Sequence, residues 1–193
     1  MEKIGLFFGS FNPVHKGHIN IAKYVLNEQK LNKVLFILSP LNPFKIESKN
    51  ILLDVNHRYE ILKLATKKYK NMIPSDIEFG MKKPNYTFDT IAKLENIYPK
   101  KNFYLIMGSD NFKYFNKWKN YEKILEKYKL LVYPRSGEKN SFLIKYNSVT
   151  LLRGSFFNIS SDKIRRKIKS RDSLEKYISK DAITYIKNNN LYI

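Results

Sequence analysis

The sequence contains no cysteine, and this absence excludes disulfide bonds and thiolate metal sites. Histidine and tryptophan are also scarce, with three residues and one residue. No apolar run approaches the roughly 18 residues that a membrane-spanning helix needs, and the first residues lack the pattern of a secretory signal. We therefore expect a protein without a membrane span, whose composition is compatible with a cytoplasmic location.

Acidic residues are few as well: 17 aspartates and glutamates stand against 36 lysines and arginines, which gives a formal net charge of +19. Such a charge is typical of proteins that bind nucleic acid or a membrane surface. The lysines are nevertheless scattered over every predicted helix, and the one dense cluster lies at residues 163–169. We therefore interpret most of the charge as a solvated surface, whose field still attracts an anionic substrate.

Apolar runs alternate with amphipathic segments along the whole chain. This alternation predicts right-handed crossovers and an α/β fold with a doubly wound, mostly parallel sheet. Because no repeat or linker divides the chain, we expect one domain over residues 1–193. The polar segment 41–54 is long for a connection and predicts a substrate loop, and residues 136–148 form a second variable loop. The expected strands are 3–8, 33–38, 73–79, 103–107, 130–133 and 149–152, and the expected helices are 17–29, 55–69, 87–97, 111–127 with a break near Trp118, 161–169 and 180–188.

The segment from Gly9 to His18 lies where the first expected strand meets the first expected helix. Strand ends of open α/β sheets bind ligands, and a helix start offers free N–H groups that suit phosphate. Gly9 allows a tight turn, Pro13 fixes a backbone angle, and Gly17 leaves room beside a phosphate. His15 and His18 can donate hydrogen bonds to a phosphoryl group. The segment predicts a nucleotide-phosphate site rather than a metal site, since only one further histidine exists.

A second candidate phosphate site precedes the expected helix 161–169, where a loop ends in serines that can cap the helix. Arg165 follows one turn later, and its planar guanidinium can grip phosphate oxygens in pairs. Arg166 is expected to face solvent. A capped basic surface helix remains the alternative interpretation.

Two other turns place polar groups at element ends. Tyr86 and Thr87 stand at the start of an expected helix, where Thr87 can serve as a cap. Gly108 and Asp110 follow an expected strand and form a turn of the kind that faces ligands. Trp118 taken alone fits a packing role.

These motifs together resemble the nucleotidyltransferase superfamily that is marked by a His-x-Gly-His signature. More closely, the chain resembles the bacterial nicotinate mononucleotide adenylyltransferases, with matching motifs in order from Gly5 to Tyr192. The resemblance implies a Rossmann-like nucleotidyltransferase fold. It also implies adenylyl transfer from ATP to nicotinate mononucleotide, giving deamido-NAD and pyrophosphate in NAD biosynthesis. Mg²⁺ would arrive with ATP and be held mostly by phosphates and water.

The resemblance further implies roles for individual residues. The catalytic residues would be His15, His18 and Arg165. The ATP-binding residues would be Gly9, Ser10, Phe11, His15, His18, Lys45, Gly108, Asp110, Arg135, Ile159, Ser160 and Arg165. The residues that bind nicotinate mononucleotide would be Ser10, Lys45, Tyr86, Thr87 and Trp118, with backbone N–H groups at Tyr86 and Thr87 on the carboxylate and Trp118 stacked on the pyridine ring. No metal site made by protein ligands is expected.

The chain departs from the usual family pattern at three positions. Phe8 stands where the family has a glycine, Asn12 where it has an aspartate, and Phe44 where it has a histidine. A role of that aspartate in charge balance or metal hydration is therefore in doubt for this chain.

Other functions stay open at this point. A phosphopantetheine adenylyltransferase is one, although that family has a threonine where His15 stands and is shorter. A cytidylyltransferase is disfavoured for the same reasons. A basic nucleic-acid-binding protein that kept the fold is another, although an aromatic-rich basic motif is missing. We expect ATP and nicotinate mononucleotide as partners, and neither membrane nor nucleic acid. The sequence leaves open the oligomeric state, a homo-oligomer included, and any strict preference for nicotinate over nicotinamide.

Overall fold

Six parallel strands form one sheet in the computed structural model, which describes residues 1–43, 52–135, 145–153 and 159–193. The strand order is β3-β2-β1-β4-β5-β6, and every neighbouring pair is parallel, as the sequence predicts. The strands are β1 (Lys3–Gly9), β2 (Lys33–Leu38), β3 (Met72–Ser75), β4 (Asn102–Gly108), β5 (Lys129–Tyr133) and β6 (Val149–Leu151).

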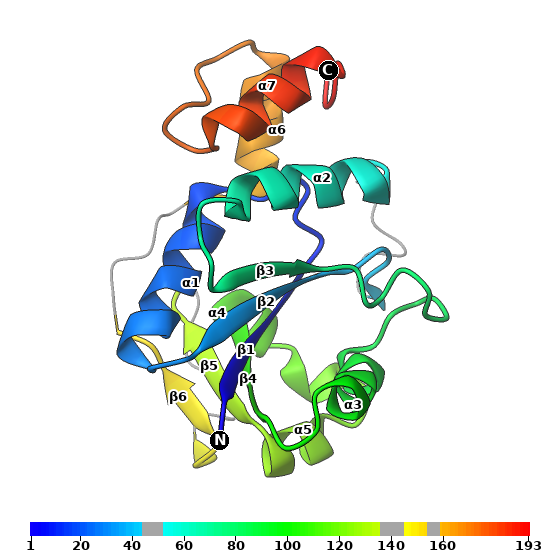
Figure 1. The fold of residues 1–193 in the computed structure, drawn as a ribbon, viewed down its shortest axis with the longest axis vertical. Helices are drawn as coiled ribbons and strands as arrows, with labels where there is room; N and C mark the ends of the chain where they lie inside the picture. The colour runs from blue at the N-terminus through cyan, green and yellow to red at the C-terminus, as the bar shows by residue number, and fades with distance from the viewer. Residues whose placement is uncertain (44–51, 136–144, 154–158) are drawn as a thin grey trace.

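Helices cover both faces of this sheet, because alternate strand residues are apolar on both sides. In β1, Leu6 packs into one buried cluster and Phe7 into the other. The Phe7 side is covered by α1 (Lys16–Glu28) and α2 (Val55–Thr66), and buried residues of α6 (Ser161–Lys169) and α7 (Lys180–Asn188) join the same cluster. The opposite side is covered by α3 (Thr87–Ile97), α4 (Ser109–Phe112), the short 3₁₀ helix η2 (Phe115–Lys117) and α5 (Tyr121–Lys127) (Figure 1). The doubly wound fold that the sequence predicts is confirmed.

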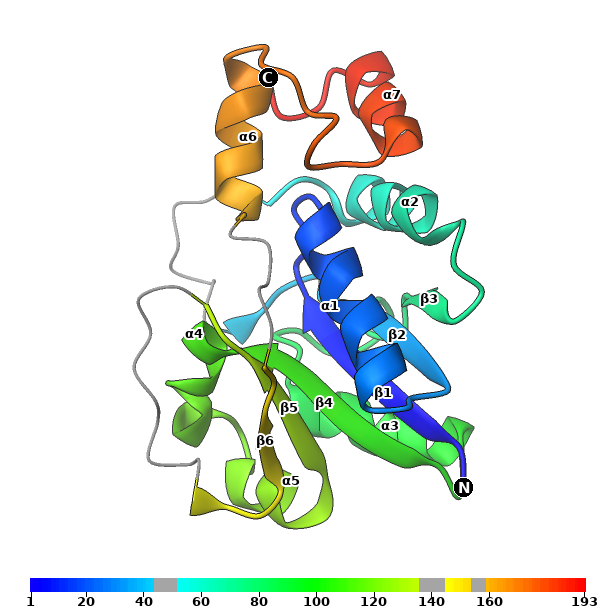
Figure 2. The ribbon, with the colours of Figure 1, turned by 90° about the vertical axis from the view of Figure 1, so that its left-hand side faces the viewer.

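The C-terminal helices lie beyond α2, at the end of the molecule opposite the N-terminus (Figures 1 and 2). Nδ1 of His57 on α2 lies 2.9 Å from the hydroxyl of Tyr185 on α7. The backbone N–H of Lys16 at the start of α1 donates to the carbonyl of Tyr177, at 2.8 Å. The last part of the chain is thereby held against α1 and α2.

Most predicted boundaries hold within a few residues, and one difference has a local cause. The expected strand 73–79 ends at Ser75, because the backbone N–H of Phe79 donates to the carbonyl of Asp76 and closes a turn. The expected helix 111–127 is broken before Trp118, as predicted, into α4, η2 and α5. Because β3 ends at Ser75 and α3 begins at Thr87, residues 76–86 form a connection beside the strand ends.

The direction of chain winding reverses at β1. From β1 the chain proceeds to β2 and β3 on one side, and then crosses to β4 and β5 on the other. In doubly wound sheets, the crevice at this switch point binds ligands.

None of the helices in the described residues combines the length and apolarity that a bilayer crossing requires.

Candidate active site

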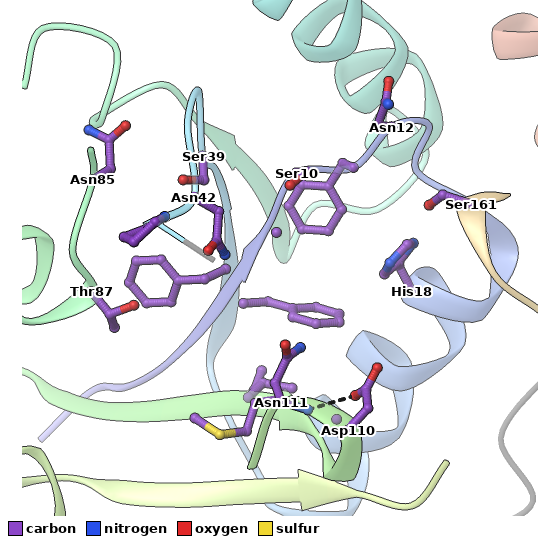
Figure 3. Close-up of a pocket in the computed structure, with 18 of the residues that line it drawn as sticks. Ser10, Asn12, His18, Ser39, Asn42, Asn85, Thr87, Asp110, Asn111 and Ser161 are labelled. Carbon is purple, nitrogen blue, oxygen red and sulfur yellow. Dashed lines mark hydrogen bonds between the residues drawn. The ribbon is translucent and has the colours of Figure 1, made fainter. Parts of the chain in front are cut away.

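A cavity of about 700 Å³ opens at the carboxyl ends of β1, β2 and β4, at the switch point of the sheet (Figure 3). Ile159 does not line it, since its side chain is buried and faces Gly17. Lys45 lies outside the described residues. All other predicted site residues line the cavity, namely Gly9, Ser10, Phe11, His15, His18, Tyr86, Thr87, Gly108, Asp110, Trp118, Arg135, Ser160 and Arg165.

The two histidines of the first corner stack on each other. Their ring centroids are 3.7 Å apart, and the planes are inclined by 31°. The backbone N–H of His15 donates to Nδ1 of His18 at 3.2 Å. A neutral imidazole with an accepting Nδ1 carries its proton on Nε2. His18 is thereby set as an Nε2–H donor at the edge of the cavity (Figure 3).

His15 is far more enclosed, with only 3% of its surface exposed. Among the described residues, neither of its ring nitrogens has a hydrogen-bond partner. Burial, and next the positive charge of Arg135, lower the pKa of His15 to about 3, so this ring is neutral at physiological pH. The expectation that His15 meets phosphate remains a prediction, since both nitrogens are covered in this structure.

The glycines of this corner make room for rings of the protein itself. A Cβ on Gly17 would lie 2.8 Å from Nδ1 of His15 and 3.1 Å from Cγ2 of Ile159. A Cβ on Gly9 would lie 2.8 Å from the ring of Phe11. Phe11 has a left-handed backbone with φ 41°, which an L residue adopts only under local strain. The sequence predicts that Gly17 leaves room beside a phosphate, whereas in the structure it leaves room for the imidazole of His15.

The start of α6 is tied to the same corner. Ser160 caps the helix by accepting from the backbone N–H of Lys163 at 3.2 Å, and Ser161 donates to the carbonyl of Pro13 at 2.9 Å. Nη1 of Arg165 donates to the carbonyl of Asn12 at 2.8 Å. The guanidinium and the start of α6 therefore face the cavity at a fixed distance from the first corner. Arg166 points to solvent, as expected, with 81% of its side chain exposed.

The start of α3 lies on the opposite wall of the cavity (Figure 3). Thr87 is its first residue, and the first N–H groups of a helix have no partner within the helix. Trp118 packs on Phe115, with ring centroids 5.1 Å apart, and lines the same cavity as Thr87. Nζ of Lys119 lies 5.1 Å from the ring centroid of Tyr86. This wall offers N–H donors, an aromatic face and a positive charge to an anionic ring.

At the end of β4, Asp110 is held between two neighbours. Its Oδ1 accepts from the backbone N–H of Asn111 at 3.0 Å, and its Oδ2 lies 3.5 Å from Nε of Arg135. The backbone N–H of Arg135 donates to the hydroxyl of Ser109 at 2.8 Å. The turn after β4 thus faces the cavity.

Several lining residues were missed by the sequence analysis, among them Ser39, Asn42, Glu78 and Asn85. Glu78 is 1% exposed, and its Oε1 accepts from the hydroxyl of Thr90 at 2.7 Å. Burial raises the pKa of the Glu78 carboxyl. Ser39 directly follows β2, and this position after a buried strand was the available signal. Nothing local to Glu78 predicts that a carboxyl in a turn is buried.

Two of the three departures from the family pattern, Phe8 and Asn12, lie in the described residues, whereas Phe44 lies outside them. Oδ1 of Asn12 accepts from the backbone N–H of Leu53 at 3.3 Å, so an amide serves as the turn's acceptor. Phe8 lines the cavity and packs against the cluster beneath α3. In the described part of the chain, no group of three or more histidine, aspartate or glutamate side chains could hold a metal ion.

Known proteins with similar sequences show the family to which the chain belongs. The sequence model of the cytidylyltransferase-like family matches residues 6–167. A protein of Flavobacterium psychrophilum named "Probable nicotinate-nucleotide adenylyltransferase" is 39% identical over 193 residues, 98% of each chain. A protein of Cytophaga hutchinsonii with the same name is 40% identical over 190 residues, again 98% of each chain.

Solved structures show the same fold. Nicotinic acid mononucleotide adenylyltransferase of Plasmodium falciparum, complexed with NaAD, superposes with a TM-score of 0.83 at 21% identity. The alignment covers 100% of this chain and 98% of that one. At this identity the likeness establishes the fold, whereas the curated relatives establish the family. The chain therefore belongs to the nicotinate-nucleotide adenylyltransferase family, within the cytidylyltransferase-like proteins.

Proposed function

We propose that this protein transfers the adenylyl group of ATP to nicotinate mononucleotide, giving deamido-NAD and pyrophosphate. One observation carries the proposal: the histidine corner of α1, the start of α6 and the start of α3 all open onto one cavity. Two of these starts suit phosphates, and the third, which shares the cavity with Trp118, suits an anionic aromatic ring. The family membership of the chain points to the same reaction.

The phosphate of the mononucleotide attacks the α-phosphorus of ATP in line and displaces pyrophosphate. This phosphate is already ionised at neutral pH, so the reaction needs no general base and no nucleophile from the protein. Catalysis then consists of positioning the two substrates and stabilising charge on the phosphoryl group. Nε2–H of His18 is the donor that we place on the α-phosphate.

The leaving pyrophosphate is assigned to the start of α6. Arg165 is anchored to Asn12 through Nη1, so its guanidinium is already oriented when ATP arrives. The N–H groups of the first turn of α6 add the positive end of the helix dipole. Arg135 and Asp110, joined at 3.5 Å, are assigned to the nucleotide beside the end of β4.

The family reaction uses a nucleoside triphosphate, for which we propose Mg²⁺ as the accompanying ion. Asp110 is a carboxylate of the cavity wall, and the described residues form no larger cluster of metal ligands. These residues fit an ion that is held mainly by the phosphates and water, which would neutralise charge on the triphosphate. We further propose that the enzyme acts as a single domain in the cytoplasm.

The start of α3 is assigned to the pyridine carboxylate. The N–H groups at Thr87 favour a charged acceptor over a neutral amide, and a hydrogen bond to a charged group contributes about 1.5–3 kcal/mol. Lys119 increases the positive potential on this wall, although Asp89 pairs with it at 2.8 Å. We therefore propose that nicotinate mononucleotide is preferred over nicotinamide mononucleotide.

A coupled assay of pyrophosphate release tests this function. ATP is offered with nicotinate mononucleotide, nicotinamide mononucleotide or phosphopantetheine in parallel reactions. We expect turnover with the first, much less with the second and none with the third. Equal rates with both pyridine substrates would refute the acid preference, and no turnover with either would refute the function.

A further inference from the structure

Arg58 on α2 is a buried arginine that neither the sequence motifs nor the proposed chemistry uses. Only 2% of its surface is exposed. Its guanidinium donates to four backbone carbonyls: those of Leu53 at 2.8 Å, Ser10 at 2.9 Å, Ser39 at 2.9 Å and Pro40 at 3.2 Å. A buried charge is retained only where many hydrogen bonds compensate its lost hydration.

No acidic side chain among the described residues forms an ion pair with Arg58. The carboxylate of Asp54, which directly precedes α2, caps the helix by accepting from the backbone N–H of Asn56 at 2.9 Å. The Arg58 side chain is therefore committed to main-chain oxygens rather than to a carboxylate. A side chain that binds only backbone fixes the positions of the segments to which that backbone belongs.

The four carbonyls come from three segments that surround the cavity. Ser10 belongs to the corner between β1 and α1, and Ser39 and Pro40 follow β2. Leu53 precedes α2. Ser10 and Ser39 both line the cavity, and a single nitrogen, Nη1, joins their carbonyls.

A second set of bonds supports the same arrangement. The backbone N–H of Ser39 donates to the carbonyl of Gly9 at 2.9 Å, and that of Leu53 donates to Oδ1 of Asn12 at 3.3 Å. The corner that we assign to ATP is thus bound to the loop after β2, which lies toward the opposite wall of the cavity (Figure 3). Arg58 is the one side chain in the described residues that bonds to all three segments at once.

We propose that Arg58 is a positioning residue, whose planar fork sets the distance between the two substrates by holding the β1–α1 corner against the loop after β2. This inference rests on the proposed function, because it assigns the two sides of the cavity to two reactants. Small displacements of reacting groups cost large factors in rate. Arg58 acts through the carbonyls of Ser10 and Ser39 and touches neither substrate.

Arg58→Lys is the test, because lysine keeps the positive charge but places its three donors on one nitrogen. Such a group cannot span carbonyls from three segments. We expect the folded variant to lose about 100-fold in kcat with little change in either KM. Each protein is assayed below its own midpoint of thermal unfolding, so that all molecules are folded.

Leu62→Ala is the matched control, because Leu62 lies one turn further along α2, is fully buried and has no side-chain donor for these carbonyls. Deleting its buried methyl groups destabilises the same helix. We expect its kcat to stay near that of the wild type when the folded protein is assayed. Arg166→Lys controls for the substitution itself on an exposed arginine.

Two outcomes overturn the proposal. Arg58→Lys with wild-type kcat shows that the fork is dispensable. Failure of Arg58→Lys to fold at any assay temperature, where Leu62→Ala folds, shows that Arg58 serves the fold alone. Failure of the proposed function appears differently, as a wild-type protein that releases no pyrophosphate with either pyridine mononucleotide.

Discussion

The backbone N–H of His15 donates to Nδ1 of His18, while the two imidazole rings stack with centroids 3.7 Å apart. This relationship gives the two histidines different tasks. The hydrogen bond fixes the tautomer of His18 and leaves Nε2 as the proton donor. The ring of His15 is neutral and buried, and it packs against the ring of His18.

Replacing His18 by alanine removes the donor that we place on the α-phosphate. Loss of one such donor typically costs about 10²–10³ in turnover, and we expect a fall of this size in kcat with the fold intact. Pyrophosphate release and circular dichroism measure the two quantities. His57→Ala is the control, since His57 is the third histidine of the chain and bonds to Tyr185 outside the cavity. A His18→Ala variant with near-normal turnover would exclude the catalytic role.

The buried ring of His15 makes stability depend on pH. Its pKa is about 3 in the folded protein, against 6.5 for an ordinary histidine, so the unfolded chain binds the proton more readily. Stability from this group is complete above pH 6.5 and is lost as pH falls toward about 3. The slope for one such group is on the order of 1 kcal/mol per pH unit.

Urea unfolding at several pH values within this window measures that slope. His15→Gln has no titrating ring at this position, so we expect a weaker dependence of unfolding free energy on pH. The wild type and the variant are compared at the same ionic strength, because the net charge of +19 also destabilises the protein in acid. Identical slopes for both proteins would show that His15 is not the group responsible.

Gly17→Ala should damage the protein, although alanine is the better helix former. A Cβ there would lie 2.8 Å from Nδ1 and 2.9 Å from Cε1 of His15. Overpacking of this kind costs about 1–3 kcal/mol, which exceeds the roughly 1 kcal/mol that alanine gains over glycine in a helix. We expect a lower midpoint of thermal unfolding and a loss of turnover as His15 and His18 are displaced.

Gly80→Ala is the control for this substitution, since no atom lies within 4 Å of a Cβ built at Gly80. Its stability should stay within about 0.5 kcal/mol of the wild type, as at most open surface positions. If the two variants unfold at the same temperature, the packing of His15 against Gly17 is not a constraint.

The sequence predicts the parallel sheet well, because each strand is a short apolar run between polar segments. The same logic places Gly9, Gly108 and Ser160 at element ends, so their approach to one cavity follows from the topology of a doubly wound sheet. Local signals of this kind depend only on neighbours in sequence. These local signals account for the fold and for most of the side of the cavity that contains the histidine corner.

The parts that escaped prediction depend on contacts between distant segments. The role of Gly17 follows from the orientation of the His15 ring and from Ile159, which is far away in the sequence. Burial of Glu78 requires Thr90 on α3 as donor. The task of Arg58 is set by carbonyls of Ser10 and Ser39, which only the folded chain brings together. The sequence around an arginine in an amphipathic helix does not predict which distant carbonyls its guanidinium will bind.

Trp118→Ala tests the part of the cavity that we assign to the pyridine ring independently of the part that we assign to ATP. Trp118 lines the cavity and packs on Phe115. Stacking on a bound ring is worth on the order of 1 kcal/mol, and with lost burial the KM for nicotinate mononucleotide should rise about tenfold. The KM for ATP should stay unchanged, because the start of α6 and the histidine corner are untouched. Tyr114→Ala is the control, as an aromatic residue of the same segment that is 48% exposed and does not line the cavity. A parallel rise in both KM values would mean that Trp118 stabilises the fold of this wall rather than the pyridine ring.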